Sequence, residues 1–166
     1  DHSHIIFKID NPEEQEISNI RDDVEAGKLI LDPYVEGNVV QQWIDSGWIR
    51  HCHARSTVPN NPKNFDTLSE DGKPGRGIQY PFKKPAPGEY HSEWEEKALE
   101  PWKKTIRSLV RFHSVDQKNT LGQISTEFIP HIDYGGGAKY SIFENSIACA
   151  KWLKKTWNKI SKYEEE

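Results

Sequence analysis

The sequence predicts an α/β fold in which short strands alternate with helices around a parallel sheet. Two strand-like runs alternate with amphipathic helical patterns, and ionisable residues stand at the ends of three successive strands. The alternation is typical of parallel sheets, and the strand-end residues are typical of barrels built from βα units. Because eight βα units need about 250 residues and this chain supplies roughly three, we expect residues 1–166 to be a single partial barrel domain. It would be the C-terminal part, completed by another chain or fragment; a doubly wound sheet is the alternative.

The first half of the chain predicts one helix and one strand. The polar stretch 11–32 is expected to be helical or looped. Asn38 is placed to cap a helix that ends at Gly47, and a strand over 48–54 should follow. Residues 56–89 hold most of the prolines and form a long loop, which within a compact domain is usually functional or wrapped over a neighbour.

The second half begins with a helix and a strand. Ser92 with Glu95 matches a capping box that opens an amphipathic helix, and Pro101 should kink this helix because an internal proline removes a backbone hydrogen bond. A strand over 123–129 follows. Glu127 lies within it, and a carboxylate in a buried strand normally has a pairing ion or a metal, because an unpaired buried charge is unfavourable.

A second capping box, Ser141 with Glu144, opens the last helix, and an acidic tail over 161–166 closes the chain. The helical spacing predicts that these residues face inward: Phe143, Ile147, Ala150, Leu153, Trp157 and Ile160. We assign the six tryptophans to packing rather than to sugar stacking, since most occupy core positions of predicted helices. They are Trp43, Trp48, Trp94, Trp102, Trp152 and Trp157.

Composition narrows the class of protein. The net charge is −4 and the pI is about 6.0, with no block of like charge, which argues against a nucleic-acid partner. No apolar window is long enough for a membrane span. Cys52 and Cys149 form no short-spaced pair, which indicates free buried thiols and a cytoplasmic location, with one long-range bridge as the alternative. The chain has no methionine and starts at Asp1, so we expect a processed or truncated product.

The strand-end residues could together hold one divalent cation. Asp1 and His4 stand at the first strand end, His53 with Arg55 at the second, and Glu127 at the third. Two carboxylates and one imidazole suit Mn²⁺ or Mg²⁺, with Co²⁺ and Zn²⁺ also suitable. Any one of these residues alone is more often a hydrogen-bonding group in a loop. Residue 51 is also a histidine on the same strand face, so the ligand is either histidine, with His53 preferred because it is nearer the carboxyl end.

These motifs resemble the last three strands of the xylose isomerase-like sugar phosphate isomerase/epimerase superfamily, which is a TIM barrel. The segments that carry the resemblance are Asp1-His2-Ser3-His4, His51-Cys52-His53-Ala54-Arg55 and Thr126-Glu127-Phe128. The resemblance covers nearly the whole chain. It implies metal ligands at Asp1, His53 and Glu127, with a fourth ligand, a glutamate, from the earlier half of the barrel. It also implies substrate contacts by His4, Arg55 and Gln79, the last in a loop similar to substrate-covering loops of the superfamily; packing against a neighbouring subunit is the alternative for that loop.

The resemblance implies a divalent-metal-dependent isomerase or epimerase that acts on a sugar or sugar-derived substrate through an enediolate. Glu127 would be both ligand and catalytic base, and His4 would orient a substrate oxygen. The expected partner is a chain or fragment that supplies the N-terminal barrel half, within an oligomer. The alternatives are a metal-dependent lyase or hydrolase of the same superfamily, or a non-catalytic carbohydrate-binding or structural subunit. Three further histidines could edge the pocket: His91, His113 and His131.

Overall fold

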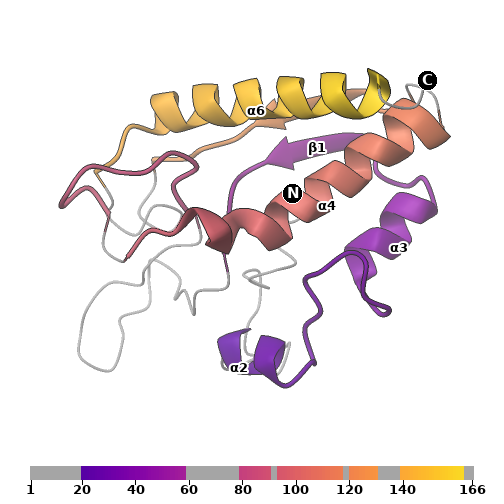
Figure 1. Ribbon diagram of the computed structural model, residues 1–166, viewed down its shortest axis with the longest axis horizontal. Helices are drawn as coiled ribbons and strands as arrows, with labels where there is room; N and C mark the ends of the chain where they lie inside the picture. Colours follow the sequence, from indigo (N-terminus) through magenta and orange to yellow (C-terminus); the bar gives the residue numbers. More distant parts are fainter. Residues whose placement is uncertain (1–19, 59–78, 91–92, 118–119, 131–138, 163–166) are drawn as a thin grey trace.

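The structure is a computed structural model that describes residues 20–58, 79–90, 93–117, 120–130 and 139–162 (Figure 1). Its elements in chain order are α2 (Ile20–Glu25), α3 (Val39–Asp45), β1 (His51–Ala54), η1 (Glu96–Leu99), α4 (Glu100–Arg111), η2 (Phe112–Asp116), β2 (Gln123–Thr126) and α6 (Ile142–Lys162). η1 is a 3₁₀ helix and η2 a single π-helical turn.

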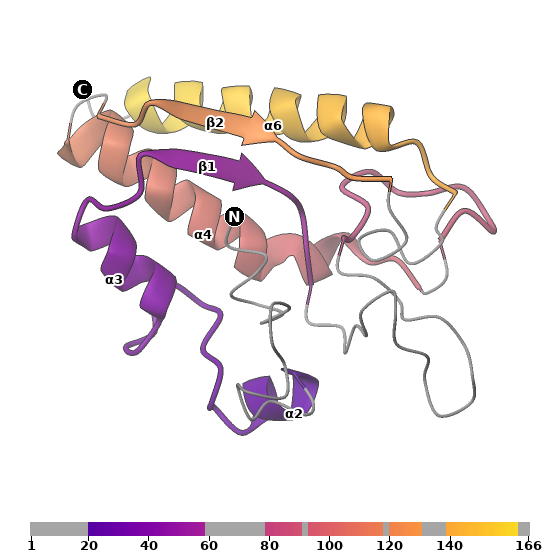
Figure 2. The same ribbon diagram turned by 180° about the vertical axis from the view of Figure 1, so that it is seen from behind.

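A parallel sheet lies at the centre of the fold, as the alternating pattern predicts. β1 and β2 run side by side in parallel, with His51 opposite Gln123 and Ala54 opposite Thr126. Figure 2 shows the two strands in front of α4 and α6, which both lie behind the sheet. Both strands are shorter than predicted. Among the described residues the sheet has these two strands, so the fold is mixed α/β with a small parallel sheet, and the larger barrel stays a prediction.

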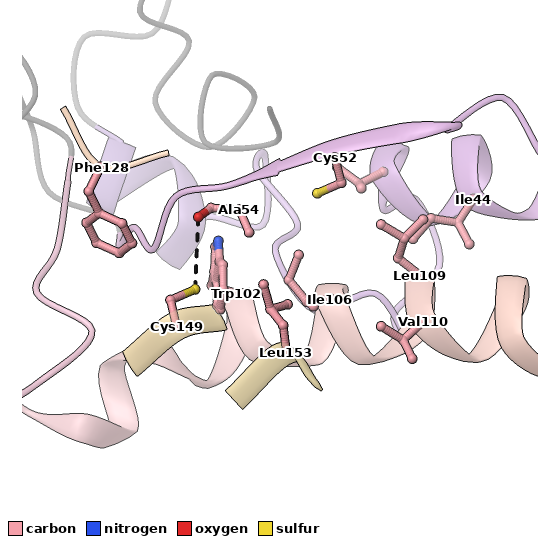
Figure 3. Packing of buried hydrophobic residues seen from close by; sticks show 11 residues of the cluster. Ile44, Cys52, Ala54, Trp102, Ile106, Leu109, Val110, Phe128, Cys149 and Leu153 are labelled. Atoms are coloured by element: carbon pink, nitrogen blue, oxygen red, sulfur yellow. Dashed lines mark hydrogen bonds between the residues drawn. The ribbon is translucent and has the colours of Figure 1, made fainter. Parts of the chain in front are cut away.

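The hydrophobic core lies between the sheet and these two helices (Figure 3). Strand side chains alternate between the two faces of a sheet. Cys52 and Ala54 therefore point from β1 toward the helices, where they meet Trp102 of α4 and Cys149 of α6. The Cys149 thiol lies 4.0 Å from the Ala54 carbonyl oxygen. Both cysteines are free and buried, as the sequence predicts, and burial raises the pKa of Cys52 to about 11 and that of Cys149 to about 12.

The helix α3 forms as its capping signals predict. Asn38 has an extended backbone, and its side-chain oxygen accepts a 2.7 Å hydrogen bond from the Gln41 backbone N–H. Gly47 closes the helix with φ of +66°, a conformation that glycine adopts without strain. Val40 and Ile44 are buried one turn apart and point into the core. The stretch 11–32 is predicted to be helical or looped. The structure describes it from Ile20 onward, where α2 and a turn follow that prediction.

The prediction for Pro101 is wrong. The residue lies in the first turn of α4, where a proline is well tolerated because the first N–H groups of a helix have no partner within it. The capping-box prediction also fails for the part of the motif that can be seen. A helix opened by Ser92 would begin at residue 93, but residues 93–95 are not helical and the 3₁₀ turn starts at Glu96; Ser92 itself lies outside the described residues.

The prediction for α6 is correct at its start and wrong for half of its face. The Glu144 backbone N–H donates to the Ser141 hydroxyl at 3.2 Å, as a capping box requires. Leu153 is buried, and Trp157 and Ile160 are half-buried against the core. By contrast, Phe143 is 71% exposed, Ile147 is 38% exposed and Ala150 is exposed. The helix buries a neighbouring stripe in their place: Asn145, Cys149, Leu153 and Thr156.

Three other expectations need correction. Trp102 is fully buried and four tryptophans are half-buried, but Trp48 is 72% exposed, so the packing assignment fails there. His113 was expected in a loop at the pocket edge; it lies fully buried in the π-helical turn η2. The first two residues of the tail predicted over 161–166 are helical, because α6 continues to Lys162, and the rest of that range lies outside the described residues. His91 and His131 lie outside the described residues.

Candidate functional site

The candidate site occupies the sheet face opposite α4 and α6. Because Cys52 and Ala54 point into the core, His51 and His53 point to the other face of β1. On β2 the same alternation brings Gln123 and Ser125 to that face, opposite His51 and His53 respectively, and Glu127 follows just past the end of the strand. In the part of the chain that the structure describes, this face carries no helix, and its side chains are exposed or half-buried.

Glu127 is the centre of the site, just beyond the carboxyl end of β2. Its Oε2 lies 3.3 Å from Nδ1 of His53 and 2.6 Å from Nη2 of Arg55. The Glu127 backbone N–H also donates to the Ala54 carbonyl at 3.4 Å, which carries the strand pairing one residue past β2. The structure thus brings together three of the predicted site residues, from two segments about seventy positions apart in sequence.

Arg55 is the most constrained member of this group. It is 1% exposed, its Nε donates to the main-chain oxygen of Glu127 at 3.1 Å, and its Nη2 donates to the carboxylate. Hydrogen bonds between charged groups are about twice as strong as neutral ones, and the planar guanidinium fixes both bonds in one geometry. The resemblance implies a substrate or loop contact for Arg55, which stays a prediction; in the structure its guanidinium holds Glu127 in place.

His51 lies one pleat below His53, farther from the carboxyl end of β1. Its Nε2 is 3.2 Å from the Ser125 hydroxyl, and its ring meets the ring of His53 edge to face at a centroid distance of 4.7 Å. Of the two histidines, His53 is therefore the one in contact with Glu127, which favours it as the metal-ligand candidate.

Gln79 connects the long loop to the segment after β2. It is 1% exposed, accepts a 2.8 Å hydrogen bond from the Ile129 N–H, and donates to the Ile129 carbonyl at 3.2 Å and to the Tyr140 hydroxyl at 3.1 Å. Burial raises the pKa of Tyr140 to about 12, so this phenol stays neutral. Thr57 and Gln79 form an isolated antiparallel bridge that ties the two ends of the loop together. The amide of Gln79 thus fixes the backbone two residues beyond Glu127.

The donor set fits part of a divalent metal site. One imidazole nitrogen and one carboxylate oxygen lie 3.3 Å apart, and both are metal ligands in proteins. Within the described ranges, no three His, Cys, Asp or Glu side chains come together. Asp1, the third predicted ligand, and His4, the predicted substrate contact, both lie outside those ranges.

Sequence reasoning missed Ser125 and Tyr140. Ser125 had a usable signal, because it lies two residues before Glu127 and so must share its sheet face. Tyr140 had none, since its contact with Gln79 joins residues sixty-one positions apart and depends on the path of the loop.

Comparison of the chain with known protein families, with curated proteins and with solved structures finds no match. None of the described helices is both long enough and apolar enough to cross a bilayer. The fold and the site therefore rest on the geometry above.

Proposed function

We propose that this chain is the C-terminal part of a TIM barrel of the xylose isomerase-like type, and that its polar sheet face is part of a divalent-metal-dependent site that isomerises or epimerises a sugar or sugar-derived substrate. The observation that carries the proposal is the approach of His53 and Glu127 to 3.3 Å across two parallel strands, at their carboxyl ends. α4 and α6 lie on one side of the sheet, as the helices of a barrel do, and Arg55 and Glu127 lie just past the carboxyl ends of the strands, where barrel enzymes build their sites.

In this proposal His53 and Glu127 hold the cation together with Asp1 and a glutamate from a partner that supplies the N-terminal barrel half. The preferred cation is Mn²⁺ or Mg²⁺, which when bound would supply Lewis-acid polarisation of the substrate's hydroxyl and carbonyl oxygens. Glu127 would remove a carbon-bound proton to give an enediolate, and His4 would orient a substrate oxygen. For epimerisation, an opposed glutamate from the other half of the barrel would have to deliver a proton to the opposite face of that carbon.

Arg55 has a positioning role in this scheme. Its two hydrogen bonds to Glu127, one to the main chain and one to the carboxylate, fix the direction of the Glu127 side chain. A base must be held within reach of the proton that it removes, and a buried arginine behind Glu127 serves that need.

A second candidate is a non-catalytic carbohydrate-binding or structural subunit. It is favoured by one observation: Oε2 of Glu127 already has two partners, Arg55 and His53, so the trio could simply be an ion-pair network that joins β1 to β2. The lyase and hydrolase alternatives share the same ligands, and no contact in the site separates them from the isomerase.

Metal binding tests the proposal, measured on the native complex whose intact mass and composition are determined first. With Mn²⁺ at 100 times its dissociation constant, a single site stabilises the folded protein by about 2.7 kcal/mol. We expect such stabilisation in the native protein, its loss in Glu127→Gln and its retention in Gln123→Ala, which changes an exposed residue of the same face. Any isomerase turnover should disappear in Glu127→Gln with an unchanged circular dichroism spectrum.

Absence of stabilisation by Mn²⁺ or Mg²⁺, with the partner present, favours the non-catalytic subunit. Retention of full turnover in Glu127→Gln removes Glu127 from the mechanism.

A further inference from the structure

One flank of α6 is apolar and exposed. Phe143, Ile147 and Ala150 follow the helical spacing i, i+4, i+7 and form one stripe, which we call the outer flank. Phe143 is 71% exposed and Ile147 is 38% exposed. The opposite flank of α6 faces α4, where Trp152 stacks obliquely on Trp102 at a centroid distance of 5.7 Å. The outer flank therefore points away from α4, to the side where the next helix of a layered α/β fold would pack.

The strand beneath this flank has a free edge. β1 occupies one edge of β2, and no other strand of the described residues pairs with the opposite edge. A groove of about 360 Å³ runs between that edge and α6. It is lined by Ile124 of β2 and by Ala150, Leu153, Lys154 and Trp157 of α6, so it continues the outer flank toward the C-terminal end of the helix. An unpaired strand edge next to an apolar helix face is a common place for another chain to add.

The charge around the outer flank indicates the kind of partner. α6 contains five lysines and one glutamate, although the whole chain has a net charge of −4. The one glutamate, Glu144, is already paired with Lys83 at 2.6 Å. Lys151 and Lys154 border the outer flank, and both are exposed. A second copy of this chain would bring these lysines toward like charge, whereas a helix with an acidic border would complement them.

We propose that the outer flank of α6, together with the groove beside β2, binds an amphipathic helix of a partner polypeptide, with apolar residues against Phe143 and Ile147 and carboxylates facing Lys151 and Lys154. The proposal deepens the partner part of the proposed function by naming the surface and the chemistry of the contact. It uses no residue of the Glu127 site, so it fails or holds independently of metal binding.

The probe is a synthetic amphipathic helical peptide of about five turns, ~18 residues, with leucines on one stripe and glutamates along its border. The matched control peptide has lysines in place of the glutamates. Each is titrated into the isotope-labelled full chain, and backbone amide shifts are recorded. We expect the glutamate peptide to shift the amides of Ile147, Ala150 and Lys154, and to bind at least about tenfold more tightly than the lysine peptide.

Two variants sharpen the test. Phe143→Ser should lower the affinity for the glutamate peptide at least about tenfold, because it removes an apolar contact. The circular dichroism spectrum should not change, because the position is exposed. Lys154→Glu should shift the preference toward the lysine peptide, because it reverses the sign of the border.

Equal affinity for both peptides, amide shifts confined to other surfaces, or no binding would each overturn the proposal. Self-association in sedimentation that Phe143→Ser abolishes would also overturn it, since the occupant would then be a second copy. Loss of metal binding with normal peptide binding would count against the proposed function alone.

Discussion

The arrangement of Glu127 illustrates how single residues define this site. A carboxylate at a strand end is unremarkable by itself, but this one is held by a buried guanidinium through both its main chain and its side chain. Leaving a buried charged group without its partner is strongly unfavourable, so Arg55 and Glu127 depend on each other. A contact of this kind makes Glu127 rigid, which a base, a metal ligand and a structural ion pair all require.

A second buried group, His113, makes stability depend on pH. It is fully buried in the π-helical turn, and its Nδ1 lies 2.7 Å from the Thr120 hydroxyl. Burial lowers the pKa of His113 below its ordinary value of 6.5; a hydrogen bond with the Ile49 backbone opposes this lowering, and the charge of Arg50 adds a smaller one. Because the unfolded chain then binds the proton more readily than the folded chain, stability is full above about pH 6.5 and declines as the pH falls toward the lowered value.

We therefore expect His113→Gln to lose less stability than the native protein between about pH 6.5 and pH 5. One proton taken up on unfolding corresponds to a slope of at most about 1.4 kcal/mol per pH unit, which sets the size of the difference. Urea unfolding at several pH values measures it. Parallel pH profiles for the two proteins would show that His113 does not control this dependence.

At the scale of elements, the sequence predicts the start of a helix correctly where the capping side chain directly precedes the helix. Asn38 and Ser141 both accept the hydrogen bond that their position predicts. The failure at Pro101 has a simple physical reason: the same proline disrupts a helix interior and suits a first turn, and sequence periodicity could not tell which of the two applied.

The cap of α3 offers a prediction at this scale. Asn38 is 4% exposed, and besides capping the helix it donates to the Ile30 carbonyl at 2.8 Å. Asn38→Ala removes both bonds and should lower the free energy of unfolding by about 1–2 kcal/mol. Asn38→Asp keeps the capping oxygen and loses the donor to Ile30, so its loss should come from that second contact alone.

Chemical denaturation of the two variants separates the contributions. If Asn38→Asp is as destabilised as Asn38→Ala, the link to Ile30 is the dominant contact and the cap contributes little. If both variants match the native protein, neither bond stabilises α3.

For the whole molecule, the sequence predicts a parallel sheet and the meeting of His53 with Glu127, because strand alternation and order in the chain determine both. It could not predict which face of α6 is buried. An apolar stripe indicates a contact but not whether the chain itself provides it. The helical spacing predicts that Phe143 and Ile147 are core, whereas the buried stripe contains Cys149 and Leu153. The error is informative, since an apolar stripe without a cover is typical of an interface.

Truncating a side chain of the buried stripe of α6 should lower the free energy of unfolding far more than truncating one of the outer flank. Leu153 is 8% exposed and packs in the main core, so Leu153→Ala removes buried methyl groups and should lower the free energy of unfolding by about 2–5 kcal/mol. Phe143→Ala removes a larger side chain from a position that is 71% exposed, and should change it by no more than about 0.5 kcal/mol. Urea unfolding of the chain without a partner measures both. A loss in Phe143→Ala comparable to that in Leu153→Ala would mean that the chain buries its own outer flank, and that no partner helix is needed to cover it.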